Sequence, residues 1–283
     1  MSFAETALLG ALAGFTIFLG LPVARLNLLS ARSRVGLAMF SVGVLVFLLV
    51  DVLAHGFEIA EHATEAFSDG EGSFGEAAGY ALLLVGGFAA GSVGLAFLEK
   101  ALSRKPALPP ISGASVDTLP ADEQLHPAET DHRRGVLISG LMIAGAIGIH
   151  NFAEGLAIGV SAGAGEISLA TVLIIGFALH NATEGFGIVG PLGEVKPSWR
   201  WLLAAGLIGG APVFLGAMLG YNVTSQPLEL AFYAVAGGAI LYVIGEIWHG
   251  MRRFGHRELG LALLACGFAA GVITDFVVVY GGG

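Results

Sequence analysis

The sequence predicts an all-α polytopic membrane protein with eight transmembrane helices. Of its 283 residues, 55% are hydrophobic and only 12% are charged, and the mean hydropathy is +0.80. An ordinary soluble domain has about 25% charged residues. The apolar residues form eight long runs, and the basic residues fall into alternate loops between these runs. Composition, run length and charge distribution therefore indicate the same fold class.

Each apolar run is long enough to cross a hydrocarbon core about 30 Å thick, which takes about 20 helical residues. The runs are continuous, so they predict helices and not the alternating strands of a membrane barrel. We interpret the first run as a retained span, because it lacks the basic start and the cleavage site of a signal peptide. The predicted spans are 3–21, 35–60, 76–98, 136–162, 167–189, 199–220, 228–249 and 257–280.

The loops predict the orientation of the chain. When the loops are numbered alternately, all 13 lysines and arginines fall on one side of the membrane. The positive-inside rule places that side in the cytoplasm and both termini outside. We therefore expect a multi-pass protein of the cell membrane (inner or plasma) that is embedded in the lipid bilayer. The net charge of −9 averages loops and spans and therefore indicates little about partners. No nucleic-acid partner is expected.

One long connection, 100–135, separates the third and fourth spans. It contains five of the ten prolines and several acidic residues, and it predicts a disordered cytoplasmic loop. Its His126 and His132 are either solvated or form a weak metal contact. The rest of the chain predicts a single transmembrane domain over 1–283.

Two nearly identical motifs lie inside apolar runs, 149-IHNFAEGLAIGVS-161 and 179-LHNATEGFGIVGP-191. A charged side chain at the bilayer centre costs about 2.5–3.5 kcal/mol, so such residues usually face the protein interior and serve a function. In each motif the histidine and the glutamate are four residues apart and share one helix face. A short turn near 163–166 lets the two faces meet. The polar motif residues are His150, Asn151, Glu154, His180, Asn181 and Glu184.

Two imidazole nitrogens and two carboxylate oxygens form a suitable four-coordinate set for Zn²⁺. The carboxylates would also neutralise the charge of a buried dication. The alternative is a hydrogen-bonded cluster that only joins the helices, but the duplication of the motif favours a metal. Gly155 and Gly185, which follow the glutamates, predict close helix contact.

This pair of motifs resembles the ZIP family of divalent-metal transporters, whose fourth and fifth spans carry HNxPEG-type sequences. The family also has eight spans, both termini outside and a long cytoplasmic loop after the third span. The resemblance implies a 3+2+3 arrangement in which the first and last three spans form an inverted repeat around the central pair. It also implies a homodimer, a metal site at the six motif residues, and import of Zn²⁺, with Fe²⁺, Mn²⁺ or Cd²⁺ as alternative substrates.

The sequence departs from the family pattern at several positions. Ala153 and Thr183 stand where the family has proline, which implies weaker kinks. Ala211 stands where many bacterial members have a glutamate, which argues against a second metal. Gly245 and Glu246 replace a His-Glu pair in the seventh span. Glu246, with His249, either assists metal release to the cytoplasm or is an interfacial structural carboxylate.

A second group of polar residues lies at the predicted outer end of the second span. Asp51, His55, Glu58 and His62 follow one helical stripe, and Asp275 in the last span is predicted to lie at a similar depth. Together they predict an electronegative mouth that collects cations. The alternative is a solvated helix extension.

Two other function classes were weighed. An intramembrane zinc hydrolase would typically carry HExxH, with the glutamate as general base, but here the second position is asparagine, so we expect no enzyme activity, no catalytic residue and no bound organic cofactor. A passive divalent-cation channel would differ from a carrier only in kinetics. The sequence contains no GxxxxGK[ST] loop for a nucleotide.

Overall fold

The computed structural model describes residues 1–26, 30–102, 121–165, 167–222, 225–252 and 254–280. The regular elements formed by these residues are all helices, with no β-strand among them. Eight helical segments are long and apolar enough to cross a membrane. They coincide with the eight predicted spans, so the predicted fold class is confirmed.

The first three spans contain several short helical pieces as well as long helices. The first span joins α1 (Phe3–Phe15), α2 (Ile17–Gly20) and the 3₁₀ segment η1 (Leu21–Arg25). The second is the single long helix α3 (Ala31–Ser68). The third runs through α4 (Phe74–Ala89), the π-helical segment η2 (Ala90–Gly94) and α5 (Leu95–Leu102).

The remaining five spans are formed by longer helices. They are α6 (Ala121–Gly163), α7 (Ile167–Val189), α8 (Trp199–Gly220), α9 (Gln226–Arg252) and α10 (Arg257–Tyr280), with the 3₁₀ turn η4 (Gly190–Leu192) after α7.

Serine residues mark where several helices begin. The side chains of Ser30, Ser73 and Ser198 each accept a hydrogen bond, 3.1 Å long, from a backbone N–H in the first turn of α3, α4 and α8. Ser2 forms a reciprocal capping box with Glu5 at the start of α1. These caps satisfy N–H groups that have no partner within the helix.

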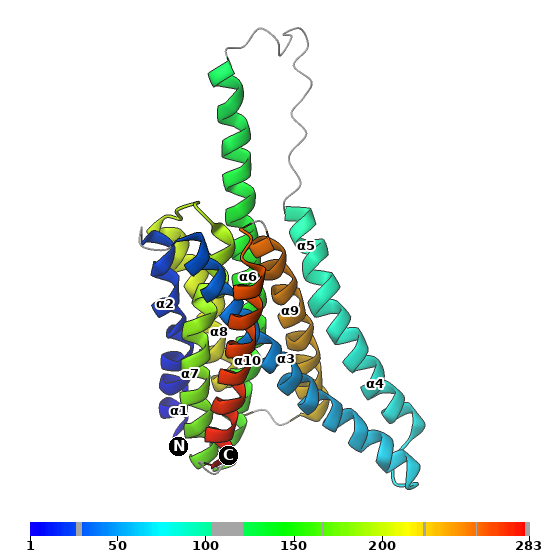
Figure 1. Ribbon diagram of the computed structural model, residues 1–283. Helices are drawn as coiled ribbons and strands as arrows, with labels where there is room; N and C mark the ends of the chain where they lie inside the picture. The colour runs from blue at the N-terminus through cyan, green and yellow to red at the C-terminus, as the bar shows by residue number, and fades with distance from the viewer. Residues whose placement is uncertain (27–29, 103–120, 166, 223–224, 253, 281–283) are drawn as a thin grey trace.

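The helices form one bundle with both termini at the same end (Figure 1). α6 packs extensively against α8 and also contacts α7, which returns antiparallel to it. The carboxyl-terminal part of α3 leans away from the bundle together with α4 (Figure 1). The two motif helices, α6 and α7, therefore lie among the helices of the bundle and not at its edge.

The outer spans make three similar contacts. α1 packs against α8, α3 packs against α10, and η2 packs against α9. Each of these crossings brings two glycines together: Gly14 with Gly210, Gly43 with Gly267, and Gly91 with Gly238. The 3+2+3 arrangement and its inverted repeat stay predictions.

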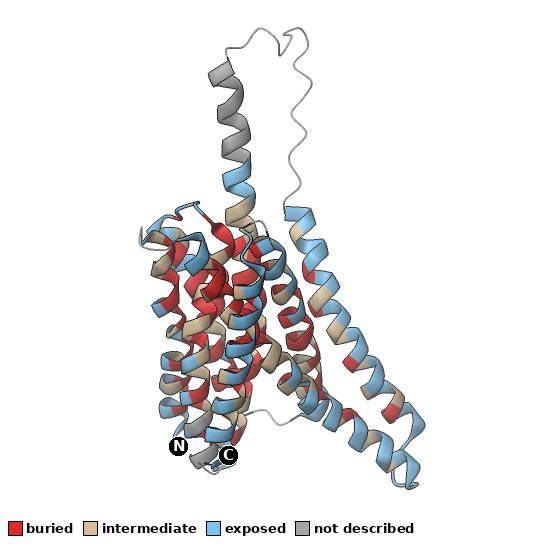
Figure 2. Ribbon diagram, in the orientation of Figure 1, coloured by how far each residue is buried: buried red, intermediate tan, exposed pale blue. Residues whose placement is uncertain are grey.

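Buried residues concentrate along the helix faces that meet inside the bundle (Figure 2). Many large apolar side chains point outward along the spans instead, among them Leu19 and Leu82, which are 71% and 73% exposed. Soluble monomers rarely expose apolar surface on this scale. The outer surface of the bundle is therefore suited to contact with lipid.

The predicted disorder of the 100–135 connection is only partly open to comparison. Residues 103–120 lie outside the described residues, as do the surroundings of the His126 side chain, so the prediction stays open there. Residues 121–135 belong to α6, and the disorder of the connection as a whole stays a prediction. The acidic residues that made this stretch look like a solvated loop also suit the first turns of a helix.

Gly155 and Gly185 allow two close helix contacts beside the motifs. A Cβ atom at Gly155 would collide with the carbonyl oxygen of Val213 on α8. A Cβ atom at Gly185 would collide with the carbonyl oxygen of Ile17 on α2. Each motif helix is thus seated directly on backbone atoms of a neighbouring helix, which is how small residues promote packing in membranes.

Replacing Gly155 with alanine is expected to destabilise the bundle by about 1–3 kcal/mol, because the added methyl group overpacks a backbone contact. Thermal unfolding in detergent would measure the loss. Gly86→Ala is the matched control, since a Cβ atom at Gly86 meets nothing within 4 Å. Equal unfolding midpoints for the two variants would contradict this packing model.

Candidate metal centre

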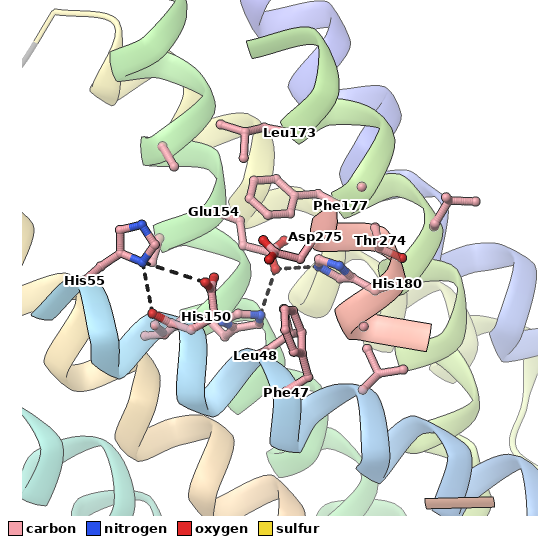
Figure 3. Close-up of a pocket in the computed structure, with 18 of the residues that line it drawn as sticks. Phe47, Leu48, His55, His150, Glu154, Leu173, Phe177, His180, Thr274 and Asp275 are labelled. Carbon is pink, nitrogen blue, oxygen red and sulfur yellow. Dashed lines mark hydrogen bonds and ion pairs between the residues drawn. The ribbon is translucent and has the colours of Figure 1, made fainter. Parts of the chain in front are cut away.

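Three side chains from α6 and α7 converge on one point inside the helix bundle. His150 and Glu154 lie one turn apart on α6, and His180 faces them from α7 (Figure 3). Oε1 of Glu154 lies 2.8 Å from Nε2 of His150 and 2.5 Å from Nε2 of His180. One ligand atom from each residue lies within 4.8 Å of the other two, a spacing that could hold a metal ion.

These side chains are removed from solvent. The exposed fractions of the His150, Glu154 and His180 side chains are 1%, 4% and 11%. Among the residues that the structure describes, Nδ1 of His150 and Oε2 of Glu154 have no hydrogen-bond partner. Buried polar atoms without partners are rare and call for an explanation. The unused lone pair of Oε2 is free to bind a cation.

Glu184 is a second buried carboxylate beside this group. It is 1% exposed, and its Oε1 lies 3.9 Å from Nε2 of His150. Nδ2 of Asn151 donates a hydrogen bond of 3.3 Å to Oε2 of Glu184. Oε1 of Glu184 has no hydrogen-bond partner. Glu184 therefore lies close enough to complete a four-residue set after a small movement.

The two motif asparagines connect the centre to other helices. Nδ2 of Asn151 donates to the carbonyl oxygen of Gly209 on α8 at 2.9 Å, and Nδ2 of Asn181 donates to that of Ala13 on α1 at 3.3 Å. Both asparagines are fully buried, and both amide oxygens lack a partner. Their nitrogens anchor the motif helices, while their oxygens, the atoms that bind metals, remain free.

A cavity of about 480 Å³ leads to the centre. Its walls include His150, Glu154 and His180, together with residues near the helix ends that face the termini, such as Ser161 and Glu229. On the other side of the centre, large apolar residues pack into the core, all of them at most 1% exposed: Ile143, Ile147, Ile188, Leu192 and Ile247. Among the described residues, the cavity therefore connects the centre with the end of the bundle that carries both termini.

The residues of the predicted outer mouth divide into two groups. Asp51, His55 and Asp275 line the same cavity as the centre (Figure 3). Glu58 and His62 are exposed and do not line it. The carboxyl-terminal part of α3 leans away from the rest of the bundle (Figure 1), and the later part of the stripe lies on this segment.

Glu246 lies elsewhere. It is half-buried near the carboxyl end of α9 and is not part of the cavity wall. On the preceding turn of α9, the Tyr242 hydroxyl donates a hydrogen bond of 2.8 Å to Glu99 on α5. The predicted role of Glu246 in metal release stays a prediction.

The cavity also contains residues that the motifs did not indicate. Glu229 and Tyr233, one turn apart on α9, form part of its wall, and the Tyr233 ring lies 5.6 Å from the His55 ring. Glu229 was recognisable in the sequence only as an acidic residue on the predicted outer side. Tyr233 carried no signal, because an aromatic residue in an apolar span is usual.

Comparison with known proteins adds no family assignment. The chain matches no protein-family model, and no curated protein matches it. The structure alone therefore defines the class: a membrane-spanning helical protein with a buried His/Glu/His group that could bind a metal.

Removing the shared carboxylate charge should strongly weaken metal binding at this group. In the Glu154→Gln variant, the affinity for Zn²⁺ is expected to fall on the order of 100-fold or more, because changes even beyond the direct ligands cost 10–100-fold. Isothermal titration calorimetry in detergent would measure it. Glu71→Gln, an exposed residue in the turn between α3 and α4, is the control with the same charge change. Unchanged affinity in Glu154→Gln would exclude this site.

Proposed function

We propose that this protein carries divalent metal ions, with Zn²⁺ as the principal substrate, across a membrane through the centre on α6 and α7. The observation that carries this proposal is the contact of one buried carboxylate oxygen with two imidazoles from different helices, at 2.5 Å and 2.8 Å. The resemblance of both motifs to the ZIP family supports it. Membership of that family, and its homodimer, are parts of the proposal.

The path of the ion begins in the cavity. Asp51 and Asp275 give its outer part negative charge, which raises the local concentration of cations. His55 stands beside Asp51 and supplies an imidazole nitrogen. From there a dehydrating ion meets Glu154, then the two motif histidines, with Glu184 as the fourth ligand. The ion would leave on the other side when the apolar packing below the centre opens.

The driving force does not require a nucleotide. If the termini lie outside, as the loop charges predict, an inside-negative membrane potential favours entry. It contributes about 2.3 kcal/mol per charge per 100 mV, or roughly twice that for a divalent ion. A carrier of this kind would support net uptake into the cytoplasm until the gradient balances the potential.

The ligand set favours particular metals. Imidazole nitrogens suit Zn²⁺ and its neighbours among the transition metals, whereas Mg²⁺ and Ca²⁺ prefer oxygen ligands. Fe²⁺, Mn²⁺ and Cd²⁺ are alternative substrates. Ca²⁺ and Mg²⁺ are expected to compete poorly for the centre.

Reconstitution into liposomes tests the proposal. Uptake of ⁶⁵Zn is expected with the wild type and is expected to be lost in both Glu154→Ala and Glu184→Ala, because each removes a charge that compensates the buried ion. Glu71→Gln should transport like the wild type. Wild-type uptake by both alanine variants, with normal insertion, would refute the assignment.

The concentration dependence of the same flux separates a carrier from a channel. A carrier that binds each ion at the centre gives uptake that saturates at low metal concentration. Flux that stays linear over the range in which the centre fills would indicate a pore, and hydrolysis of a membrane substrate without flux would indicate an enzyme.

A further inference from the structure

Ser41 on α3 lies beside the motif segment of α7. Its side chain is fully buried, and its hydroxyl donates a hydrogen bond of 2.6 Å to the backbone carbonyl oxygen of Thr183. Thr183 lies between His180 and Glu184. This bond therefore joins α3 to the turn of α7 that carries two of the proposed metal ligands.

Ser41 continues the face of α3 that forms the cavity wall. Val44, Leu48, Asp51 and His55 line the cavity at spacings of three and four residues, which place side chains on one helix face. Ser41 lies three residues before Val44 on this stripe and does not itself line the cavity, although the neighbouring Phe40 does. The same face of α3 thus lines the approach to the centre and then holds the helix that provides His180.

The local packing lets the serine reach the backbone of α7. A Cβ atom at Gly187, one turn after Thr183, would lie 3.6 Å from Cβ of Ser41 and 3.1 Å from Cδ1 of Ile247. An alanine at this position would make an ordinary contact with Ser41 and would require the Ile247 side chain to shift by a few tenths of an ångström. Residue 187 is therefore a direct neighbour of Ser41, and its small size leaves the space beside the serine open.

Two hydroxyl groups fix the backbone of the motif turn. The Thr183 hydroxyl donates to the carbonyl oxygen of His180 at 2.7 Å, and the Ser41 hydroxyl donates to the carbonyl oxygen of Thr183. The first bond is within α7, and hydroxyls bonded back to their own helix often bend it. The second bond comes from another helix and restrains where the bent turn lies.

We propose that Ser41 is a positioning residue for the metal centre. His180 must meet Glu154 across the seam between α6 and α7, and functional constellations need their geometry held within about 0.5 Å. The Ser41 bond sets the rotation and depth of the α7 turn against α3, and hence the place of the His180 ring. This inference rests on the proposed metal binding of the centre.

Cobalt binding tests the positioning role, because the visible spectrum of Co²⁺ reports the geometry of its ligands. The Ser41→Ala variant, purified as the full chain, is expected to bind Co²⁺ and Zn²⁺ about three- to tenfold more weakly, in line with the loss of one hydrogen bond. Its Co²⁺ spectrum should differ from that of the wild type. Ser41→Thr keeps the hydroxyl and should restore both properties.

The matched control is Ser92→Ala. Ser92 also donates to a backbone carbonyl, that of Phe88, at 2.8 Å, but this bond lies within its own span and does not reach a motif helix. Wild-type affinity and spectrum are expected in this variant. A Ser41→Ala protein that unfolds at the wild-type temperature and binds Co²⁺ with the wild-type spectrum and affinity would overturn the inference.

If Ser41→Ala does not fold, Ser41→Cys replaces it in a Zn²⁺ titration, since a thiol is similar in size but a weak donor. Weaker binding supports the positioning role, and equal or tighter binding overturns it. Failure of the proposed function gives a different result: the wild type itself would then bind neither Co²⁺ nor Zn²⁺, or would bind them equally well after Glu154→Gln.

Discussion

The structure depends on the compensation of charge around Glu154. A carboxylate in the interior of a membrane protein is costly unless a cation or strong hydrogen-bond donors surround it. Here two imidazoles meet one of its oxygens, and each comes from a different helix. These polar contacts favour the pairing of α6 with α7. In a membrane, apolar side chains alone would give little preference for one neighbouring helix over another.

The surroundings of the centre are built to keep these two helices in register. Each motif helix is seated on a neighbour through a glycine, and each is tied to a neighbouring helix through an asparagine nitrogen. α6 is held in this way by α8, and α7 by the first span. The residues of the motif thus serve two purposes. Some provide candidate ligand atoms, and others hold the motif helix against its neighbouring helix.

Much of the fold and of the candidate site could be predicted from the sequence. The features that could not be predicted depend on tertiary packing or on residue types that are common in apolar spans. Hydrophobic length determines the spans, and the spacing of four residues between His150 and Glu154 places both on one face, so these features were accessible. Glu58 and His62 lie on the part of α3 that leans away from the bundle (Figure 1), which is a feature of tertiary packing, and they do not line the cavity. The sequence did not indicate a role for Tyr233 or Ser41, because residues of these types are common in apolar spans.

The spacing around Glu154 has a mechanical consequence. Ligand atoms arranged tetrahedrally about a zinc ion, with bonds of about 2.0–2.1 Å, lie about 3.3 Å from one another. The two nitrogens stand 2.5 Å and 2.8 Å from the oxygen, closer than the ligands of a tetrahedral zinc ion lie to one another. If an ion binds here as proposed, it must first separate these side chains. Because the side chains belong to two helices, the separation takes place at the seam between α6 and α7.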